Sequence, residues 1–143
     1  MKQSGVYHLF VYGSLRSGFQ SHAYEYISRF FHLLGPAKVK GELYDLGPYP
    51  AAIPSGEDMY IVGELYSVKD AAEFSWAIGQ LDDYEGVNAE AGEAQLYRRE
   101  LTEVFTRDDK VIAWIYWYNG DVSGKPVVLS GDILEYLQAK KGS

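Results

Sequence analysis

The sequence predicts one domain of the α+β class, with a small mixed and curved sheet, or an open β-barrel, flanked by helices. Two observations lead to this prediction. Stretches with strand pattern and stretches with helix pattern are mixed along the chain without the regular alternation of βαβ units. The tetrapeptide Gly-Glu-Leu-Tyr also occurs twice, at residues 41–44 and 63–66, which indicates two similar strands with a glycine where a curved sheet bends.

The individual elements follow from periodicity and from turn residues. Segment 47–56 holds three prolines and two glycines, so we expect a stiff loop that packs down as a pocket wall. The predicted strands are 6–12, 39–46, 60–68, 96–106 and 111–118, the last two joined as a hairpin across 107–110. The predicted helices are 21–34, ended by Gly35-Pro36, then 70–85, begun by Asp70 and Glu73 and ended by Gly86, and a last one that starts at Ser130-Gly131-Asp132.

The composition suits one globular domain over residues 1–143. The chain has no cysteine, which excludes disulfides and thiol chemistry and fits a reducing cytoplasm. Residues 1–6 carry no long apolar run, so we expect neither a signal peptide nor a membrane span. With 13 basic and 20 acidic residues the net charge is −7, and no run of Lys and Arg exceeds two residues, which argues against nucleic acid as a partner.

Several motifs of known chemistry are incomplete in this chain. Gly13 and Gly18 have the spacing of a phosphate-binding loop, but Phe19-Gln20 follows where Lys and Ser or Thr are required. No G-x-S-x-G elbow occurs, so Ser14 is not marked as a hydrolase nucleophile. The three histidines lack the spacing of metal ligands. The sequence therefore predicts no nucleotide and no metal.

Three carboxylates crowd the predicted end of the second helix, at Asp82, Asp83 and Glu85. Carboxylates at a helix C-terminus face the negative end of the helix dipole, which costs about 0.3–1 kcal/mol each, and they also repel one another. Sequences that break a local rule in this way often do so at a functional site.

Helical geometry separates these acids. Phe74, Ile78 and Leu81 form one apolar stripe, and Glu85 continues it four residues after Leu81. Asp83 points roughly to the opposite side, whereas Asp82 lies at the edge of the stripe. A carboxylate on an apolar face has a raised pKa, as a general acid/base near neutral pH requires. A helix-terminal Glu that bonds to a neighbouring loop explains the pattern equally well.

The first strand ends abruptly at Tyr12-Gly13-Ser14-Leu15. A strand that stops at glycine leaves backbone N–H groups without ladder partners, and such a turn can hold a carboxylate or an oxyanion. An ordinary turn into a helix is the alternative for this short motif.

Together these segments resemble the γ-glutamyl cyclotransferases and their AIG2-like relatives. The order and spacing of the motifs carry the resemblance more than any one of them, and it covers about residues 6–118. The matching motifs are Tyr12-Gly13-Ser14-Leu15-Arg16, Gly41 to Leu46, Tyr49-Pro50-Ala51, Gly63 to Tyr66, Leu81 to Gly86, Tyr97-Arg98 and Ala113 to Tyr116.

The resemblance implies a small mixed fold with a barrel-like sheet and a cavity between the first-strand turn and the helix that carries the Glu. It implies that a γ-glutamyl group cyclises to 5-oxoproline and releases an amine or an amino acid, without cofactor or metal. Glu85 is then the general acid/base. The residues expected to bind the small-molecule substrate are Tyr12, Gly13, Ser14, Leu15, Tyr49, Tyr97, Arg98 and Tyr118.

Several alternatives stay open at this point. The hairpin face of Tyr97, Arg98 and Tyr118 can equally turn outward, and Arg98 can form a surface ion pair with Glu100 or Glu103. The protein can also be a non-catalytic small-molecule-binding protein with the same fold and pocket, or a lyase or amide hydrolase in which the same Glu activates water. The leaving amine and the oligomeric state are likewise open.

Overall fold

The computed structural model describes residues 7–13, 22–46, 50–55, 58–85 and 97–141, and at 22–24, 83–85 and 140–141 it describes the backbone alone. The elements in chain order are β1 (His8–Val11), α1 (His22–Phe30), β2 (Phe31–Asp45), β3 (Pro50–Pro54), β4 (Tyr60–Val68), α2 (Phe74–Glu85), β5 (Tyr97–Phe105), β6 (Lys110–Tyr118) and α3 (Ile133–Lys141). A 3₁₀ turn, Ala71–Glu73, leads into α2.

The sheet closes into a barrel. Strands β2, β4, β1, β6 and β5 are hydrogen-bonded in that order, and β2 also pairs with β5 through Lys38 and Phe105. Strands β1 and β6 are parallel, whereas the other neighbours are antiparallel. Strand β3 extends the sheet beside β2. The predicted α+β fold with a curved, barrel-like sheet is confirmed.

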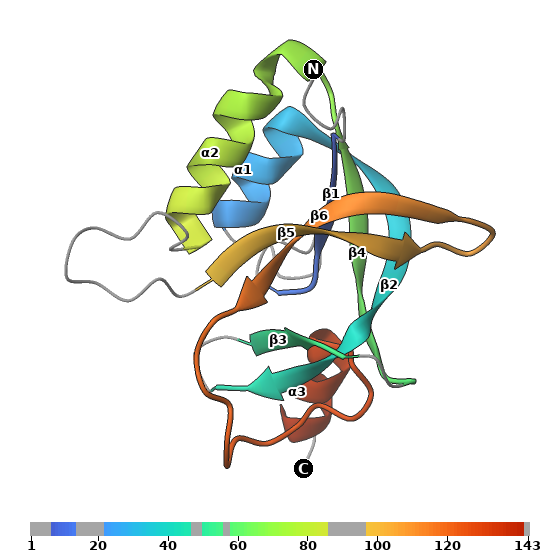
Figure 1. Ribbon diagram of the computed structural model, residues 1–143, viewed down its shortest axis with the longest axis vertical. Helices are drawn as coiled ribbons and strands as arrows, with labels where there is room; N and C mark the ends of the chain where they lie inside the picture. Colours follow the sequence, from blue (N-terminus) through green and yellow to red (C-terminus); the bar gives the residue numbers. More distant parts are fainter. Residues whose placement is uncertain (1–6, 14–21, 47–49, 56–57, 86–96, 142–143) are drawn as a thin grey trace.

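Alternation along the strands produces two buried clusters. One draws side chains from every strand and from the start of α3, and it fills the barrel: Phe10, Tyr12, Ala37, Val39, Leu43, Ala52, Ile61, Leu65, Val104, Ala113, Ile115, Trp117, Val128 and Ile133. The other joins the opposite strand faces to α1 and α2, which lie side by side in Figure 1: Leu9, Val11, Ile27, Phe31, Tyr66, Phe74, Ala77, Ile78, Leu81, Tyr97 and Tyr116. Thus β1 and β6 send alternate residues into both clusters.

The predicted helix 21–34 is wrong in its last third. Helix α1 ends at Phe30, and Phe31 begins β2, which pairs with β4 as far as Lys40. Gly35 does not end a helix but lies at a bulge within the strand, with φ of 146°. Leu34 is 55% exposed, so the apolar spacing that suggested a helix does not mark a buried face. Pairing with β4 satisfies the backbone of this segment instead.

The predicted loop 47–56 is also partly wrong, because Pro50–Pro54 forms the strand β3. It pairs antiparallel with β2, and Pro50 and Pro54 are its terminal residues. Proline lacks an N–H donor, but an edge strand leaves one side without a ladder, so prolines are tolerated there. Tyr49 lies outside the described residues.

Other boundaries agree with the sequence. Strand β4 spans Tyr60–Val68 as predicted, and β5 and β6 form the expected hairpin. A carboxylate oxygen of Asp70 accepts the N–H of Ala72, and one of Asp132 accepts that of Leu134, so both predicted helix starts carry an acidic cap.

The repeated Gly-Glu-Leu-Tyr has a physical reason at each site. A Cβ atom on Gly63 would lie 2.1 Å from the carbonyl oxygen of Val11, and one on Gly41 would lie 2.9 Å from that of Ile53. Both glycines therefore stand where neighbouring backbones approach too closely for a side chain. In both copies the Tyr hydroxyl donates to the Glu two residues earlier, at 2.8 Å from Tyr44 and 3.0 Å from Tyr66.

We expect Gly63→Ala to lower the free energy of unfolding by at least about 2 kcal/mol, because the added methyl group meets backbone rather than a movable side chain. Urea unfolding followed by tryptophan fluorescence measures this change. The matched variant is Gly79→Ala in α2, where a Cβ meets nothing within 4 Å and a gain of about 0.5–1 kcal/mol is expected. Equal effects of the two changes would contradict the close approach at Gly63.

Candidate functional site

Tyr116 of β6 contacts both segments that the sequence marks as functional. The hydroxyl of Tyr12, just after β1, donates to the backbone oxygen of Tyr116. The Tyr116 hydroxyl in turn donates to Oδ1 of Asp82 in α2, at 2.9 Å. Both tyrosine side chains are buried. Tyr12, just after the first strand, and Asp82, near the C-terminal end of α2, are therefore both hydrogen-bonded to Tyr116.

Asp82 is the buried acid of the crowded helix end, with 6% of its surface exposed. The guanidinium group of Arg99 in β5 donates two hydrogen bonds to this carboxylate, from Nε to Oδ1 at 2.7 Å and from Nη2 to Oδ2 at 3.0 Å. The Arg99 guanidinium also lies 4.5 Å from the ring centre of Trp114. Arg99 and Tyr116 are direct partners across the hairpin, so both reach Asp82 from the same sheet face.

The role of Asp82 was missed by sequence reasoning, which placed it only at the edge of the apolar stripe. Its position is explained by Arg99, a cation near the C-terminus of α2 that offsets both the helix dipole and the burial of the carboxylate. The available signal was weak: Arg99 shares a strand face with Tyr97, and a cation on a face that packs against a helix favours an acidic partner there.

Glu85 is the last residue of α2, three positions after Asp82. The helix ends where the sequence predicted. The Glu85 side chain lies outside the described part of the structure, so its role as acid/base stays a prediction.

Further predicted site residues gather where β1 ends. A Cβ atom on Gly13 would lie 3.2 Å from Cγ of Pro50, the first residue of β3. The backbone oxygen of Pro50 accepts the hydroxyl of Tyr97 at 2.9 Å. The rings of Tyr97 and Tyr118 meet edge to face, with centres 5.4 Å apart. Gly13 and Tyr97 thus lie against Pro50, and Tyr118 lies against Tyr97; we call these residues the wall around Pro50. Ser14 and Leu15 lie outside the described residues.

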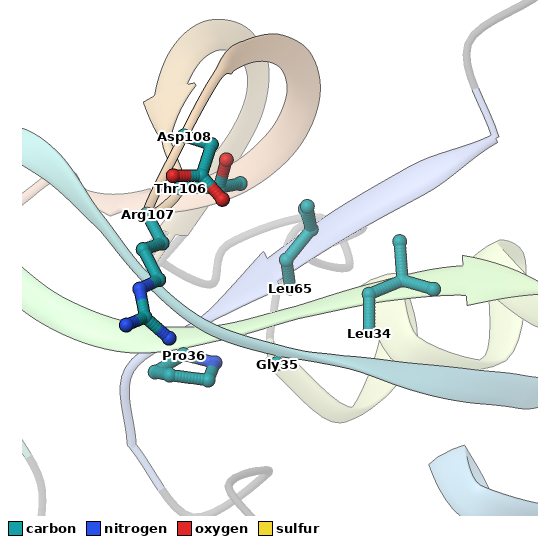
Figure 2. Close-up of a pocket in the computed structure, with 7 residues that line it drawn as sticks. All are labelled: Leu34, Gly35, Pro36, Leu65, Thr106, Arg107 and Asp108. Carbon is teal, nitrogen blue, oxygen red and sulfur yellow. The ribbon is translucent and has the colours of Figure 1, made fainter.

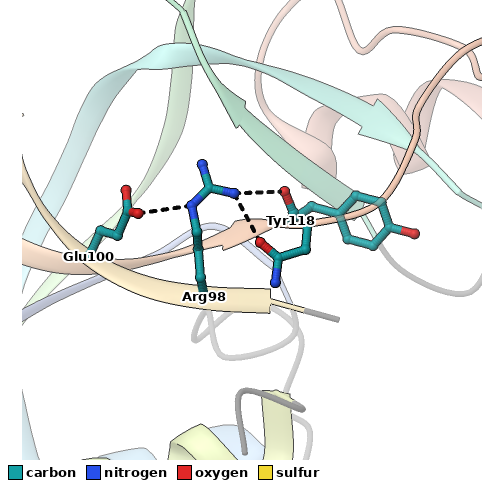
Figure 3. Close-up of polar contacts among 4 residues, drawn as sticks. Arg98, Glu100 and Tyr118 are labelled. Carbon is teal, nitrogen blue, oxygen red and sulfur yellow. Dashed lines mark hydrogen bonds and ion pairs between the residues drawn. The ribbon is translucent and has the colours of Figure 1, made fainter. Parts of the chain in front are cut away.

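Arg98 lies on the other face of β5 from Tyr97 and Arg99. Figure 3 shows its guanidinium between Glu100 and the backbone oxygen of Tyr118. Its Nε is 2.9 Å from the Glu100 carboxylate, and Nη1 donates to Asn119 at 3.0 Å. The alternative of an exposed ion pair with Glu100 is therefore confirmed, and a role of Arg98 in substrate binding stays a prediction.

A separate surface pocket of about 300 Å³ lies beside the hairpin turn (Figure 2). No residue that the sequence marks as functional lines it. Arg107 extends over Pro36, and the buried Leu65 forms part of the floor. Its lining residues are Leu34, Gly35, Pro36, Leu65, Thr106, Arg107 and Asp108.

Two further properties concern the described residues only. In that part of the chain no three His, Cys, Asp or Glu side chains come together as metal ligands would. No helix within it has both the length and the apolar character needed to cross a membrane.

We expect Arg99→Met to lower the free energy of unfolding by about 3 kcal/mol, because it leaves the Asp82 carboxylate buried without its ion-pair partner. The neighbouring Arg98→Met is the matched control. It breaks an ion pair whose side chains are 36% and 50% exposed, so less than about 1 kcal/mol is expected. Thermal and urea unfolding of both variants measure the difference. Similar losses of unfolding free energy in both would show that the ion pair of Arg99 with Asp82 does not stabilise the fold more than the exposed ion pair of Arg98 does.

Comparisons with known proteins show the family of the chain. Residues 9–135 match the family model described as gamma-glutamyl cyclotransferase, AIG2-like. A Vibrio cholerae protein, provisionally named a gamma-glutamylcyclotransferase, is 35% identical over 126 residues, which are 87% of this chain and 92% of that protein. The gamma-glutamylcyclotransferase family protein YtfP of Escherichia coli is 30% identical over 128 residues, 89% of this chain and 96% of that protein.

Among solved structures, YkqA from Bacillus subtilis superimposes with a TM-score of 0.71 at 26% identity. The match covers 95% of this chain and 42% of YkqA, so this chain spans less than half of that protein. The match over residues 9–135 and the identity to relatives over nearly their whole length give one conclusion: the chain belongs to the γ-glutamyl cyclotransferase, AIG2-like family.

Proposed function

We propose that the protein converts a γ-glutamyl amine or γ-glutamyl amino acid to 5-oxoproline and a free amine, with Glu85 as general acid/base. One observation carries the proposal beyond family membership. Tyr116 bonds to Tyr12 through its backbone oxygen and to Asp82, three residues before Glu85, through its hydroxyl. These two hydrogen bonds support the proposal, because they relate Tyr12, in the expected substrate turn, to the helix end that carries Glu85.

The reaction needs a proton transfer and a held geometry, but no redox step. The α-amine of the glutamyl group attacks its own γ-carbonyl carbon, a C–N bond forms in the ring, and the C–N bond to the leaving group breaks. The α-amine is an ammonium ion at neutral pH, so it must lose a proton before it attacks. The leaving nitrogen must gain one, and therefore a single acid/base can serve both steps.

Glu85 supplies that acid/base in this proposal. Its carboxylate accepts the proton of the ammonium group and returns it to the leaving nitrogen. Assistance of this kind typically contributes about 10²–10⁴-fold to the rate. Because amine and carbonyl belong to one molecule, a site that holds the ring-closing pose adds to this without joining two reactants.

The wall around Pro50 holds the glutamyl group. We assign this role to the turn Tyr12 to Leu15 with Tyr49, Tyr97 and Tyr118, and the backbone N–H groups of the turn stabilise charge on the carbonyl oxygen. Arg98 offers a guanidinium group for the substrate carboxylate, which would then compete with Glu100. The bond from Tyr97 to Pro50 supports this assignment, because it holds the ring at the edge of β3.

We expect the wild-type protein to release 5-oxoproline from at least one member of a panel of γ-glutamyl amino acids and γ-glutamyl amines, as measured by mass spectrometry. Glu85→Gln should lower the rate by at least about 100-fold, because the amide cannot accept the proton. Glu73→Gln is the matched control, since it makes the same change at an exposed position before α2 and should keep the activity.

Three other outcomes would contradict parts of the proposal. Free glutamate as the product would indicate hydrolysis by an activated water. Binding of a panel member without product, unchanged in Glu85→Gln, would indicate a non-catalytic binding protein. Equal activity of Glu85→Gln and wild type would remove Glu85 from the mechanism.

A further inference from the structure

We infer that Tyr116 is a positioning residue, whose hydroxyl holds the Glu85 end of α2 in register with the Tyr12 turn by way of Asp82. The inference rests on the proposed function. Tyr116 is not a catalytic residue in this scheme, because it acts on the site through another side chain.

The first step of the argument is the dual contact of Tyr116. Its backbone oxygen belongs to the sheet and accepts the hydroxyl of Tyr12, whereas its own hydroxyl leaves the sheet and reaches Asp82. The side chain is 3% exposed, so water does not replace this bond readily. One residue thus relates the helix end to the turn.

The second step is that Arg99 and Tyr116 make different contacts with the Asp82 carboxylate. Arg99 contacts both carboxylate oxygens, while Tyr116 shares only Oδ1, at 2.9 Å. The two-pronged contact of Arg99 keeps the helix attached to β5. The Tyr116 hydroxyl adds a contact from β6, the strand that borders β1. Loss of this hydroxyl therefore leaves the ion pair in place but releases the helix end from the strand that meets the turn.

The third step is the short distance along the helix from Asp82 to Glu85. Three residues of helix amount to nearly one turn, about 4.5 Å along the axis. The last carbonyls of α2 lack intrahelical N–H donors, so the placement of its final turn depends on tertiary contacts. A misplacement of about 1 Å can cost 100-fold in rate. A small displacement at Asp82 therefore also displaces the backbone of Glu85 at the helix end.

Tyr116→Phe isolates the hydroxyl, because the ring and the backbone oxygen stay. The chain offers a matched control in Tyr66→Phe. Tyr66 lies in the same buried cluster, is 1% exposed, and donates its hydroxyl to Glu64 at 3.0 Å. Both variants remove one buried hydroxyl from a carboxylate, but only one of these carboxylates lies near the end of α2.

The experiment combines steady-state kinetics on a panel substrate with hydrogen exchange of the amides at 82–85. For Tyr116→Phe we expect a fall in kcat of about 10- to 100-fold with KM changed less than about threefold, because binding precedes proton transfer. Exchange at 82–85 should quicken by about tenfold, the effect of one hydrogen bond to a charged group. Tyr66→Phe should leave kcat and the exchange at 82–85 within about twofold of wild type.

A double-mutant cycle of Tyr116→Phe with Asp82→Asn tests whether Tyr116 acts on the helix end through Asp82. If Tyr116 acts through Asp82, the double variant loses no more kcat than the worse single variant. Fully additive losses of kcat would overturn the inference that Tyr116 acts through Asp82. Unchanged amide exchange at 82–85 in Tyr116→Phe would overturn it as well. A wild-type protein without product would refute the proposed function alone, since the exchange comparison of Tyr116→Phe with Tyr66→Phe would still decide whether Tyr116 holds the helix end.

Discussion

The ion pair between Asp82 and Arg99 is the contact on which the arrangement of the candidate site depends. Asp82 opposes the dipole of its own helix and is buried, so it is tolerated only because Arg99 approaches both carboxylate oxygens. Arg99 can approach because it stands opposite Tyr116 in the hairpin and lies against Trp114. Helix α2, which carries Glu85, is thereby attached to β5 and β6 at its last turn.

Because the sheet is closed, the attachment of α2 to β5 and β6 also affects its position relative to β1. Because β6 is the parallel neighbour of β1, a helix held on β6 is also held relative to the end of β1. Alternate residues of β6 point into the barrel and toward the helices, so one strand couples the barrel core to the helix layer. Helix α3 lies at the other end of the molecule (Figure 1), where the hydroxyl of Tyr136 donates to the carboxylate of Asp45, the last residue of β2, at 2.8 Å.

Short sequence patterns correctly predicted the elements that depend on interactions between residues close in the sequence. Asp70 and Asp132 cap helices because their side chains reach N–H groups two residues ahead, and β4 follows from its own residue pattern. The helix over 21–34 failed because the ladder of Phe31 and Leu33 with β4 outweighs a helical spacing of apolar residues. The loop over 47–56 failed because an edge position lets a proline-bounded segment form a strand.

For the site, the sequence by itself determined the order of the motifs, the crowding of acids at the end of α2, and the glycines where strands approach closely. The family follows from that order together with the match over residues 9–135. Only the tertiary structure decided that Asp82 is a buried acid of the helix end and that Tyr116 connects it to Tyr12. The physical reason is that a carboxylate is buried only where a cation and a hydroxyl from distant strands meet it, and helical periodicity carries no information on those partners.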